Sequence, residues 1–458
     1  MIENDAFKLL LINLFHLNPD DIANILCTTF NKMMILVVTL TDKHQACPYC
    51  GFTAPKIKEY VTKEITHSAL TTQKCIIKYR ARRYKCSCCG KTYYEFNPFV
   101  FKSQKISILT VHNILKDLKD FNETFTSVAR RYHVSPTSVS TIFDNHVDIG
   151  RNPLPEIINF DEVYAFKSKK SKYVCVLLDF KKQIPVDVLP NRKKEYLLNY
   201  FQKIPLEERK KVKYACSDMY EVYRDVVHKV FPSCCMLLDY FHLSQDFHRK
   251  MNEVRIKVMK GYKDNKASDE YYLLKKFNWL LFKNPEDEDK YGRLFDVERE
   301  RKYNSHFKSY MNYYDLRKKL LEINNDLTIC YSLKLELVDF YSKSTVDNAK
   351  ENLENLIRSC IDTNIEEMIA FSNNLINWKQ EIINSFTIVG TEYKVEADKG
   401  QVVVCNKKVN NAIIENRNKI IKCIKNNANG YTNWSRFRNR VMYVLDPNAT
   451  FSLEPREK

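Results

Sequence analysis

The sequence predicts an α/β protein built from a mixed β-sheet, a long helical region and small N-terminal modules. Five short apolar segments with strand composition follow one another from about residue 155. Residues from about 243 to 390 show helical periodicity, Lys- and Glu-rich faces and few turn signals. Three strands with short connections, followed by strand, helix and strand, are typical of a mixed sheet with helices packed on it. With 44% hydrophobic and 28% charged residues, the 458-residue chain can bury several such cores.

The charge of the chain favours a polyanionic partner. Lys and Arg number 73 and Asp and Glu 56, a net charge of +17, which suits nucleic acid or an acidic membrane surface. No apolar run approaches the ~20 residues of a membrane span, and the N-terminus lacks the basic and apolar stretches of a secretory signal. We therefore expect a cytoplasmic protein with no membrane partner. The 8 glycines, without a GxGxxG or GxxxxGKS/T motif, argue against a glycine-rich phosphate loop.

Residues 1–44 are predicted to form a helix followed by a strand. Residues 34–40 have strand composition. The residues before them include five apolar positions at helical spacing, which are expected to share one face. They are Phe7, Leu10, Leu11, Leu14 and Phe15.

Two Cys-x-x-Cys pairs, each followed by glycine, predict a zinc ribbon over residues 45–100. Cys47 and Cys50 form the first pair and Cys86 and Cys89 the second, with 35 residues between positions 50 and 86. Four thiolates in two such knuckles suit tetrahedral Zn²⁺, and the glycines let each knuckle turn tightly. The separation exceeds the ~15–20 residues of compact fingers. Free buried thiols or a redox pair are the alternatives, and 15 cysteines without an export signal argue against a disulfide scaffold.

Residues 101–152 are predicted to form a small helical domain with a helix-turn-helix at 125–143. Ser135 followed by Pro136 is a typical helix start. In the second helix the outward residues are small and polar, as entry into a major groove requires; they are Thr137, Ser138, Ser140 and Thr141. Four arginines are candidate phosphate contacts, although they could equally be solvated charges: Arg82, Arg83, Arg130 and Arg131. An ordinary helical hairpin is the alternative interpretation.

Three carboxylates are candidate ligands of divalent cations. Asp161 ends the first strand of the expected sheet, Asp218 ends the fourth, and Glu415 lies on a helix predicted over 411–427. Neighbouring strand ends can bring two aspartates together and a packed helix can add a glutamate; such a cluster repels itself unless cations neutralise it. Two ions would stabilise the attacking and leaving oxygens of a phosphodiester. An aspartate at a strand end is also a common turn residue, and four rivals fit the same pattern: Glu162, Asp179, Asp187 and Asp239.

The surroundings of Glu415 are strongly basic. Between positions 405 and 440 it is the only acid among nine Lys and Arg residues. That environment suits a DNA backbone. We expect DNA contacts from three of these residues on the same helix: Arg417, Lys419 and Lys422.

Short blocks in a fixed order resemble bacterial insertion-sequence transposases of the ISL-three type, which carry a DDE catalytic domain. Each block is short, but the ordered combination is specific and spans residues 45–440, nearly the whole chain. Besides the helix-turn-helix, the blocks are CPYCG at 47–51, RYKCSCCG at 83–90, DEVY at 161–164, SDMYEVY at 217–223, FP at 231–232, DYFH at 239–242, NAIIENRNKIIKCIK at 411–425 and NGY at 429–431.

The resemblance implies an RNase H-like core with a helical insertion between the second aspartate and the glutamate, here 197 residues apart. Asp161, Asp218 and Glu415 would then be the catalytic residues that bind Mg²⁺ or Mn²⁺. Asp239 and His242 would form a supporting DxxH motif, although His242 as an ordinary core histidine stays open. The expected segments are 1–44, 45–100, 101–152, a core of 153–258 with 400–445, an insertion at 259–399 and a loose tail at 446–458.

We therefore expect a DNA transposase. Its zinc ribbon and helix-turn-helix would bind the terminal inverted repeats of an insertion sequence. The metal-bound acids would cut the element end and join the released 3′-hydroxyl to target DNA. Bringing two ends together implies a homodimer or larger assembly on double-stranded DNA. A sequence-specific regulator with an inactive nuclease fold is the main alternative, and a metal-dependent repair nuclease is another.

Overall fold

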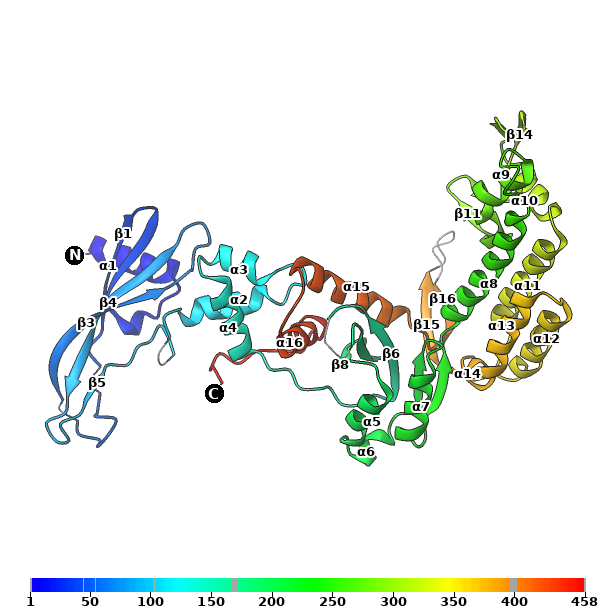
Figure 1. Cartoon of the computed structure of the whole chain (residues 1–458). Coiled ribbons are helices and arrows are strands. Elements are labelled where there is room, and N and C mark those ends of the chain that lie inside the picture. Colours follow the sequence, from blue (N-terminus) through cyan, green and yellow to red (C-terminus); the bar gives the residue numbers. More distant parts are fainter. Residues whose placement is uncertain are drawn as a thin grey trace.

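The computed structural model describes residues 2–43, 45–53, 55–101, 104–166, 171–395 and 402–456. The chain forms an elongated series of units (Figure 1): an N-terminal sheet, a three-helix unit, a central sheet and, at the opposite end, a helical region. Within the described ranges no helix is long and apolar enough to cross a membrane.

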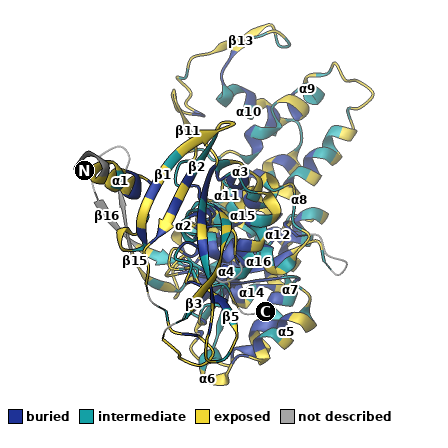
Figure 2. Cartoon of the chain, turned by 90° about the vertical axis from the view of Figure 1, so that its left-hand side faces the viewer, coloured by how far each residue is buried: buried dark blue, intermediate teal, exposed yellow. Residues whose placement is uncertain are grey.

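The N-terminal sheet joins two segments that the sequence analysis separates. Its strands are β1 (Ile22–Phe30), β2 (Met33–Leu40), β3 (Lys56–Thr66), β4 (Cys75–Lys85) and β5 (Thr92–Tyr94). They pair in the order β1-β2-β4-β3, with β5 on β4. Because β2 pairs in parallel with β4, the expected boundary at residue 44 falls inside one sheet. Helix α1 (Ile2–Leu14) supplies Leu11 and Ile12 to the shared core, whereas Phe7, Leu10 and Leu14 are exposed. Buried and exposed residues alternate in the second half of β2, whereas β1 buries Ile22 and Ile25 and is otherwise largely exposed (Figure 2).

Three helices follow the N-terminal sheet: α2 (Ile108–Asp117), α3 (Phe125–Arg131) and α4 (Pro136–His146). The predicted start of α4 is confirmed, since the Ser135 side chain accepts a hydrogen bond from the Ser138 N–H and Pro136 is the first helical residue. His133 adopts a φ of +53° in the turn before it. Val128, Val139 and Phe143 are buried between the helices.

The central sheet contains all five strands predicted from the sequence. They are β6 (Ile157–Val163), β7 (Val174–Asp179), β8 (Pro185–Leu189), β9 (Tyr214–Ser217) and β10 (Cys235–Leu238). Their order is β10-β9-β6-β7-β8, with β6, β7 and β8 antiparallel and β9 and β10 parallel to β6. Helices α5 (Lys194–Gln202), α6 (Leu206–Arg209) and α7 (Glu221–Val230) fill the connections. Strands β7 and β8 are buried along their whole length, which explains their nearly unbroken apolar sequence.

The helical region after β10 has a core of its own. Its helices are α8 (Tyr240–Lys260), α9 (Asp269–Lys276), α10 (Tyr313–Glu322), α11 (Asn325–Lys343), α12 (Ala349–Asp362), α13 (Glu366–Asn377) and α14 (Lys379–Asn384). Two short hairpins, unforeseen from the sequence, interrupt it: β11 (Glu288–Asp289) with β12 (Gly292–Arg293), and β13 (Lys302–Asn304) with β14 (Ser309–Met311). Helix α8 runs without a break through the expected boundary at residue 259.

The chain returns to the central sheet through a hairpin of β15 (Ile388–Val395) and β16 (Val402–Lys408), followed by α15 (Ala412–Asn427). The helix predicted over 411–427 is present as α15, and a further helix that the sequence analysis did not predict, α16 (Trp434–Leu445), follows it. Helix α16 contributes Phe437 and Val441 to the core between α15 and the central sheet, and Tyr443 to the core of the three-helix unit.

The segment after α16 is also attached, as far as it is described. The Ser452 N–H donates to the carbonyl of His146 at 3.1 Å, and the ring of Phe451 contacts that of His112. The expected loose tail at 446–458 is therefore docked on α2 and α4 through residue 456.

Candidate functional site

Three aspartates lie at one edge of the central sheet. Asp161 is near the C-terminal end of β6, Asp218 directly follows β9, and Asp239 directly follows β10 as the N-cap of α8. Because these three strands are parallel, their C-terminal ends meet at the same edge. We call this group, with Glu415, the acidic edge.

Helix α15 is held against β6 by buried asparagines. Asn159 Nδ2 donates to Asn411 Oδ1 at 2.7 Å and to the Asn410 carbonyl at 2.8 Å. Asn159 and Asn411, the N-cap of α15, are fully buried. About two turns later, Asn418 Nδ2 donates to Asp161 Oδ2 at 2.7 Å. The first turn of α15, which carries Glu415, is thereby fixed to the strand that carries Asp161.

His242 lies between acids from two different elements. Its Nε2 atom is 3.8 Å from Asp239 Oδ2 and 3.7 Å from Glu415 Oε1. One ligand atom from each of the three residues lies within 4.8 Å of the others, so together they could hold a metal ion. The DxxH spacing has this result because Asp239 begins α8 and His242 follows within the first turn. The structure thus puts His242 beside the acids and not in an apolar core.

The acids crowd one another electrostatically. Burial raises the pKa of Asp161 to about 7; the charges of Asp218 and Glu415 add to the rise, and His242 opposes it. Burial also raises the pKa of Asp218, and the nearby His242 and Arg192 oppose that rise. Asp218 Oδ1 is buried without a hydrogen-bond partner among the described residues. Crowded carboxylates with an orphaned oxygen fit a hard divalent cation, which takes oxygen ligands.

Three rival acids are engaged elsewhere. Glu162 forms an ion pair with Arg192. Asp187 forms one with Arg438, with 2.7 Å between the nearest atoms. Asp179 accepts two backbone N–H groups in the turn after β7. Of the four rivals, the aspartate before α8 is the one that joins the acidic edge.

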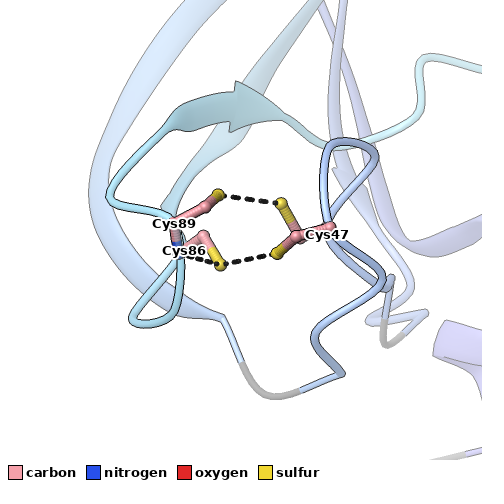
Figure 3. A group of neighbouring side chains, drawn as sticks. Cys47, Cys86 and Cys89 are labelled. Atoms are coloured by element: carbon pink, nitrogen blue, oxygen red, sulfur yellow. Dashed lines mark hydrogen bonds between the residues drawn. The ribbon is translucent and has the colours of Figure 1, made fainter.

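The four cysteines of the two knuckles meet in one cluster, three of them labelled in Figure 3. The sulfurs of Cys47 and Cys89 are 3.7 Å apart and those of Cys50 and Cys86 are 3.5 Å apart. A tetrahedral zinc ion with Zn–S bonds of ~2.3 Å needs sulfurs ~3.8 Å apart, so the cluster is compatible with structural zinc.

The backbone of each knuckle supports this arrangement. Gly51 and Gly90 have φ values of +74° and +70°, which glycine adopts without strain. The Cys89 N–H donates to Cys86 Sγ, and backbone hydrogen bonding lowers the pKa of Cys86 to about 7. A thiol that ionises near neutral pH is ready to bind a metal.

On α4, Thr137 and Thr141 are exposed, while Ser138 and Ser140 are half-buried. All four lie away from the packed residues of that helix. Arg130 on α3 is also exposed.

The three other candidate arginines hold the local fold. Arg131 forms ion pairs with Asp117 and Glu123. Arg82 pairs with Glu95 at 2.7 Å and also donates to the Leu40 carbonyl. Arg83 pairs with Glu59 at 2.6 Å.

The basic residues near Glu415 divide into two groups. Lys419 and Lys422 are exposed on α15, and Arg417 donates to the Gln183 carbonyl at 3.2 Å. The arginines of α16 instead bind other units: Arg436 pairs with Asp144 of α4 at 2.6 Å, and Arg440 donates to two carbonyls before α3. Several basic residues that were expected to face DNA therefore form contacts within the protein.

Sequence reasoning missed the residues that arrange the acids. Asn418 is three residues after Glu415, a spacing that places both on one side of a helix, and this was the available signal. Asn159 and Asn411 carry no comparable pattern. The role of Arg192 beside Asp218 was not foreseen either.

Comparisons with known proteins agree with this architecture. A sequence model of the DDE transposase family of the ISL3 type, described as "Transposase", matches residues 158–397. That range contains Asp161 and Asp218 and ends before Glu415. The transposase for insertion sequence element IS1001 of Bordetella parapertussis is 19% identical over 411 residues, which cover 89% of this chain and 91% of that protein. With more than half of its length matched by the family model, the chain belongs to the ISL3-type family of transposases.

Proposed function

We propose that the acidic edge is the catalytic centre of a DNA transposase that cleaves the ends of an insertion sequence and joins them to target DNA. The observation that carries the proposal is the meeting of Glu415 with His242 and the aspartates, although the helical region separates them in the chain. The strand order supports an RNase H-like core, since three antiparallel strands are extended on the β6 side by two strands parallel to β6.

The residues that would hold Mg²⁺ or Mn²⁺ are Asp161, Asp218 and Glu415, with Asp239 and His242 adjacent. A bound divalent ion would supply charge stabilisation for the oxygens of the phosphodiester. Asn418 fixes the orientation of Asp161. His242 Nε2 lies between Asp239 and Glu415, 3.8 and 3.7 Å from their nearest oxygens, and has no hydrogen-bond partner among the described residues. A bound divalent cation would neutralise the repulsion between these acids, so their crowding favours cation binding.

The chemistry needs no covalent enzyme intermediate. In cleavage, water adds to the phosphorus and the bond to the 3′-oxygen breaks, which leaves a 3′-hydroxyl and a 5′-phosphate. In strand transfer, that 3′-hydroxyl attacks a target phosphodiester, one P–O bond forms and one breaks, and the attacking oxygen loses its proton. The chain's part is to hold both oxygens and the phosphorus in line at the acidic edge.

We assign sequence recognition of DNA to the N-terminal units and phosphate contacts to exposed basic residues of α3 and α15. Helix α4 would act as the recognition helix of a helix-turn-helix, entering a major groove with its outward residues: Thr137, Ser138, Ser140 and Thr141. Arg130, Lys419 and Lys422 are exposed and would contact phosphates. A zinc-bound cysteine cluster would stiffen the hairpin of β3 and β4. Because an element has two ends, we expect at least a homodimer on DNA, acting in the bacterial cytoplasm.

A strand-transfer assay with terminal-repeat DNA tests the proposal. The wild-type protein should join ends to target DNA with Mg²⁺, and Asp218→Ala and Glu415→Ala should each abolish both steps while keeping DNA binding. Asp225→Ala is the matched control, since this partly exposed aspartate pairs with Lys194 and is not a member of the acidic edge. Activity that survives either acidic-edge substitution would remove the proposed centre. Wild-type binding without cleavage would instead favour a DNA-binding regulator.

A further inference from the structure

Three tyrosine rings, two of them exposed, contact two cations next to the acidic edge. Tyr164 follows β6, Tyr173 precedes β7 and Tyr220 follows β9. Arg192, after β8, and Lys425 on α15 complete the group, which we call the aromatic rim. Strands β6, β8 and β9 end at the edge where β7 begins, so the aromatic rim and the acidic edge lie on the same side of the sheet.

The contacts inside the aromatic rim are close. The guanidinium of Arg192 lies 4.7 Å from the ring centre of Tyr173 and 4.6 Å from that of Tyr220. Lys425 Nζ lies 5.1 Å from the ring centre of Tyr164. The rings of Tyr164 and Tyr173 meet edge to face, with centres 5.7 Å apart and planes at 72°. Arg192 also pairs with Glu162, the residue after Asp161, and its charge acts on Asp218.

The two outer tyrosines keep much of their surface in solvent. Tyr164 is 46% exposed and Tyr173 is 39% exposed. Each ring has two faces, and the edge-to-face contact together with the neighbouring cation leaves ring surface uncovered. Large aromatic side chains left open beside cations are the elements with which proteins bind unpaired bases, because every base has a π-face and every nucleotide a phosphate.

We propose that the aromatic rim binds an unpaired nucleotide of the DNA beside the scissile phosphate. Its base would stack on Tyr164 and Tyr173, and its phosphate would lie near Lys425 and Arg192. This inference rests on the proposed function and deepens it, since it states that the DNA enters the site locally opened. Removing a base from the duplex costs unstacking energy, and stacking on the rings offsets part of that cost. The rim would be tolerant of sequence, because it reads no base edge.

The test compares two DNA duplexes that carry the terminal repeat. One is fully paired, and the other has one unpaired nucleotide at the cleavage position. Binding is measured without divalent metal by fluorescence anisotropy, and 2-aminopurine at the unpaired position reports stacking by quenching. The wild-type protein should prefer the unpaired DNA by about tenfold, the size expected for one stacked base, and should quench its fluorescence.

Substitutions separate stacking from other roles of the same residues. Tyr164→Leu combined with Tyr173→Leu should lose the preference and the quenching, while Tyr164→Phe should keep both. Tyr310→Leu is the matched control, because this tyrosine is 68% exposed on β14 at the tip of the helical region (Figure 1). Thermal unfolding of each variant confirms that it is folded.

Two results would overturn the proposed role of the aromatic rim. One is equal affinity of the wild-type protein for both duplexes, and the other is a preference for unpaired DNA that persists in the folded double leucine variant. Strand transfer by the wild-type protein is measured in parallel on the fully paired duplex. Transfer without a preference for unpaired DNA would refute the rim and leave the proposed function standing. A preference without transfer would support the rim and count against the proposed chemistry.

Discussion

Replacing Asp161 with asparagine should stabilise the metal-free protein while it abolishes cleavage. The folded protein raises the pKa of this carboxyl from 3.8 to about 7, so its ionised form is less stable in the fold than in the unfolded chain. Above about pH 7 the carboxylate must be ionised in the fold, against a pKa shift of about 3 units. At 1.36 kcal/mol per unit, this lowers the free energy of unfolding by about 4 kcal/mol as an upper limit. Asparagine keeps an oxygen that can accept from Asn418 and removes the charge.

The sign of the effect predicts its pH dependence. Because the folded pKa is raised, wild-type stability is lost as pH rises from about 4 to about 7, and the gain from Asp161→Asn grows over the same window. We expect a gain of several degrees in the unfolding midpoint at about pH 8 in EDTA, and less than half of the free-energy gain at about pH 5. Adding Mg²⁺ should stabilise the wild type more than the variant.

The assay is thermal unfolding at both pH values, with Asp225→Asn as the control. Asp225 forms an ion pair with Lys194, which lowers the pKa of Asp225. Its replacement should therefore bring no gain in stability. A lower midpoint for Asp161→Asn at pH 8, or a gain that is the same at both pH values, would refute the crowding of these carboxylates.

Three further predictions address other parts of the chain. Cys50→Ser should remove the zinc and expose the β3–β4 hairpin to proteolysis, whereas Cys88→Ser should keep one zinc per chain by elemental analysis; equal zinc in both would exclude the cluster. Asn418→Leu should weaken Mg²⁺ binding about 10–100-fold, measured by the metal-dependent shift in midpoint, because second-sphere partners orient ligands; an unchanged affinity would contradict the role of its 2.7 Å bond to Asp161. Burial lowers the pKa of His67 below 6.5, so the N-terminal sheet should lose stability as pH falls below about 6.5; His67→Gln should flatten that slope in unfolding curves from about pH 5 to 8, and an unchanged slope would assign it to other groups.

Local patterns predicted the elements whose cause is local. The central strands are short apolar runs, and the start of α4 is set by Ser135 and Pro136, so both were visible in the sequence. The cysteine cluster was predictable because the chemistry of zinc restricts spacing and residue type. The parallel pairing of β2 with β4 was not, since it depends on contacts between residues such as Leu36 and Ile77, far apart in the chain.

Helix α16 was missed for a related reason. Its arginines at 436, 438 and 440 resemble a solvated basic segment, but their partners lie 250 or more residues away, at Asp144, Asp187 and the carbonyls before α3. A charge with a distant partner has the same appearance in a sequence as a charge in water. The same limit applies to the site: strand ends pointed to Asp161 and Asp218, whereas the asparagines that hold α15 in place became apparent only from their contacts.

The packing of α16 sets an order of events during synthesis. Arg440 seals the three-helix unit about 320 residues after the carbonyl of Asp120 that it binds has left the ribosome, which at ~5–20 residues per second is a delay of roughly a quarter of a minute to a minute. Until then the three-helix unit lacks its contacts with α16, although Glu415 of α15 has been made shortly before. A partly made polypeptide therefore cannot have a rigidly mounted, complete acidic edge. Only in a chain translated past α16 can that helix join the three-helix unit to the central sheet.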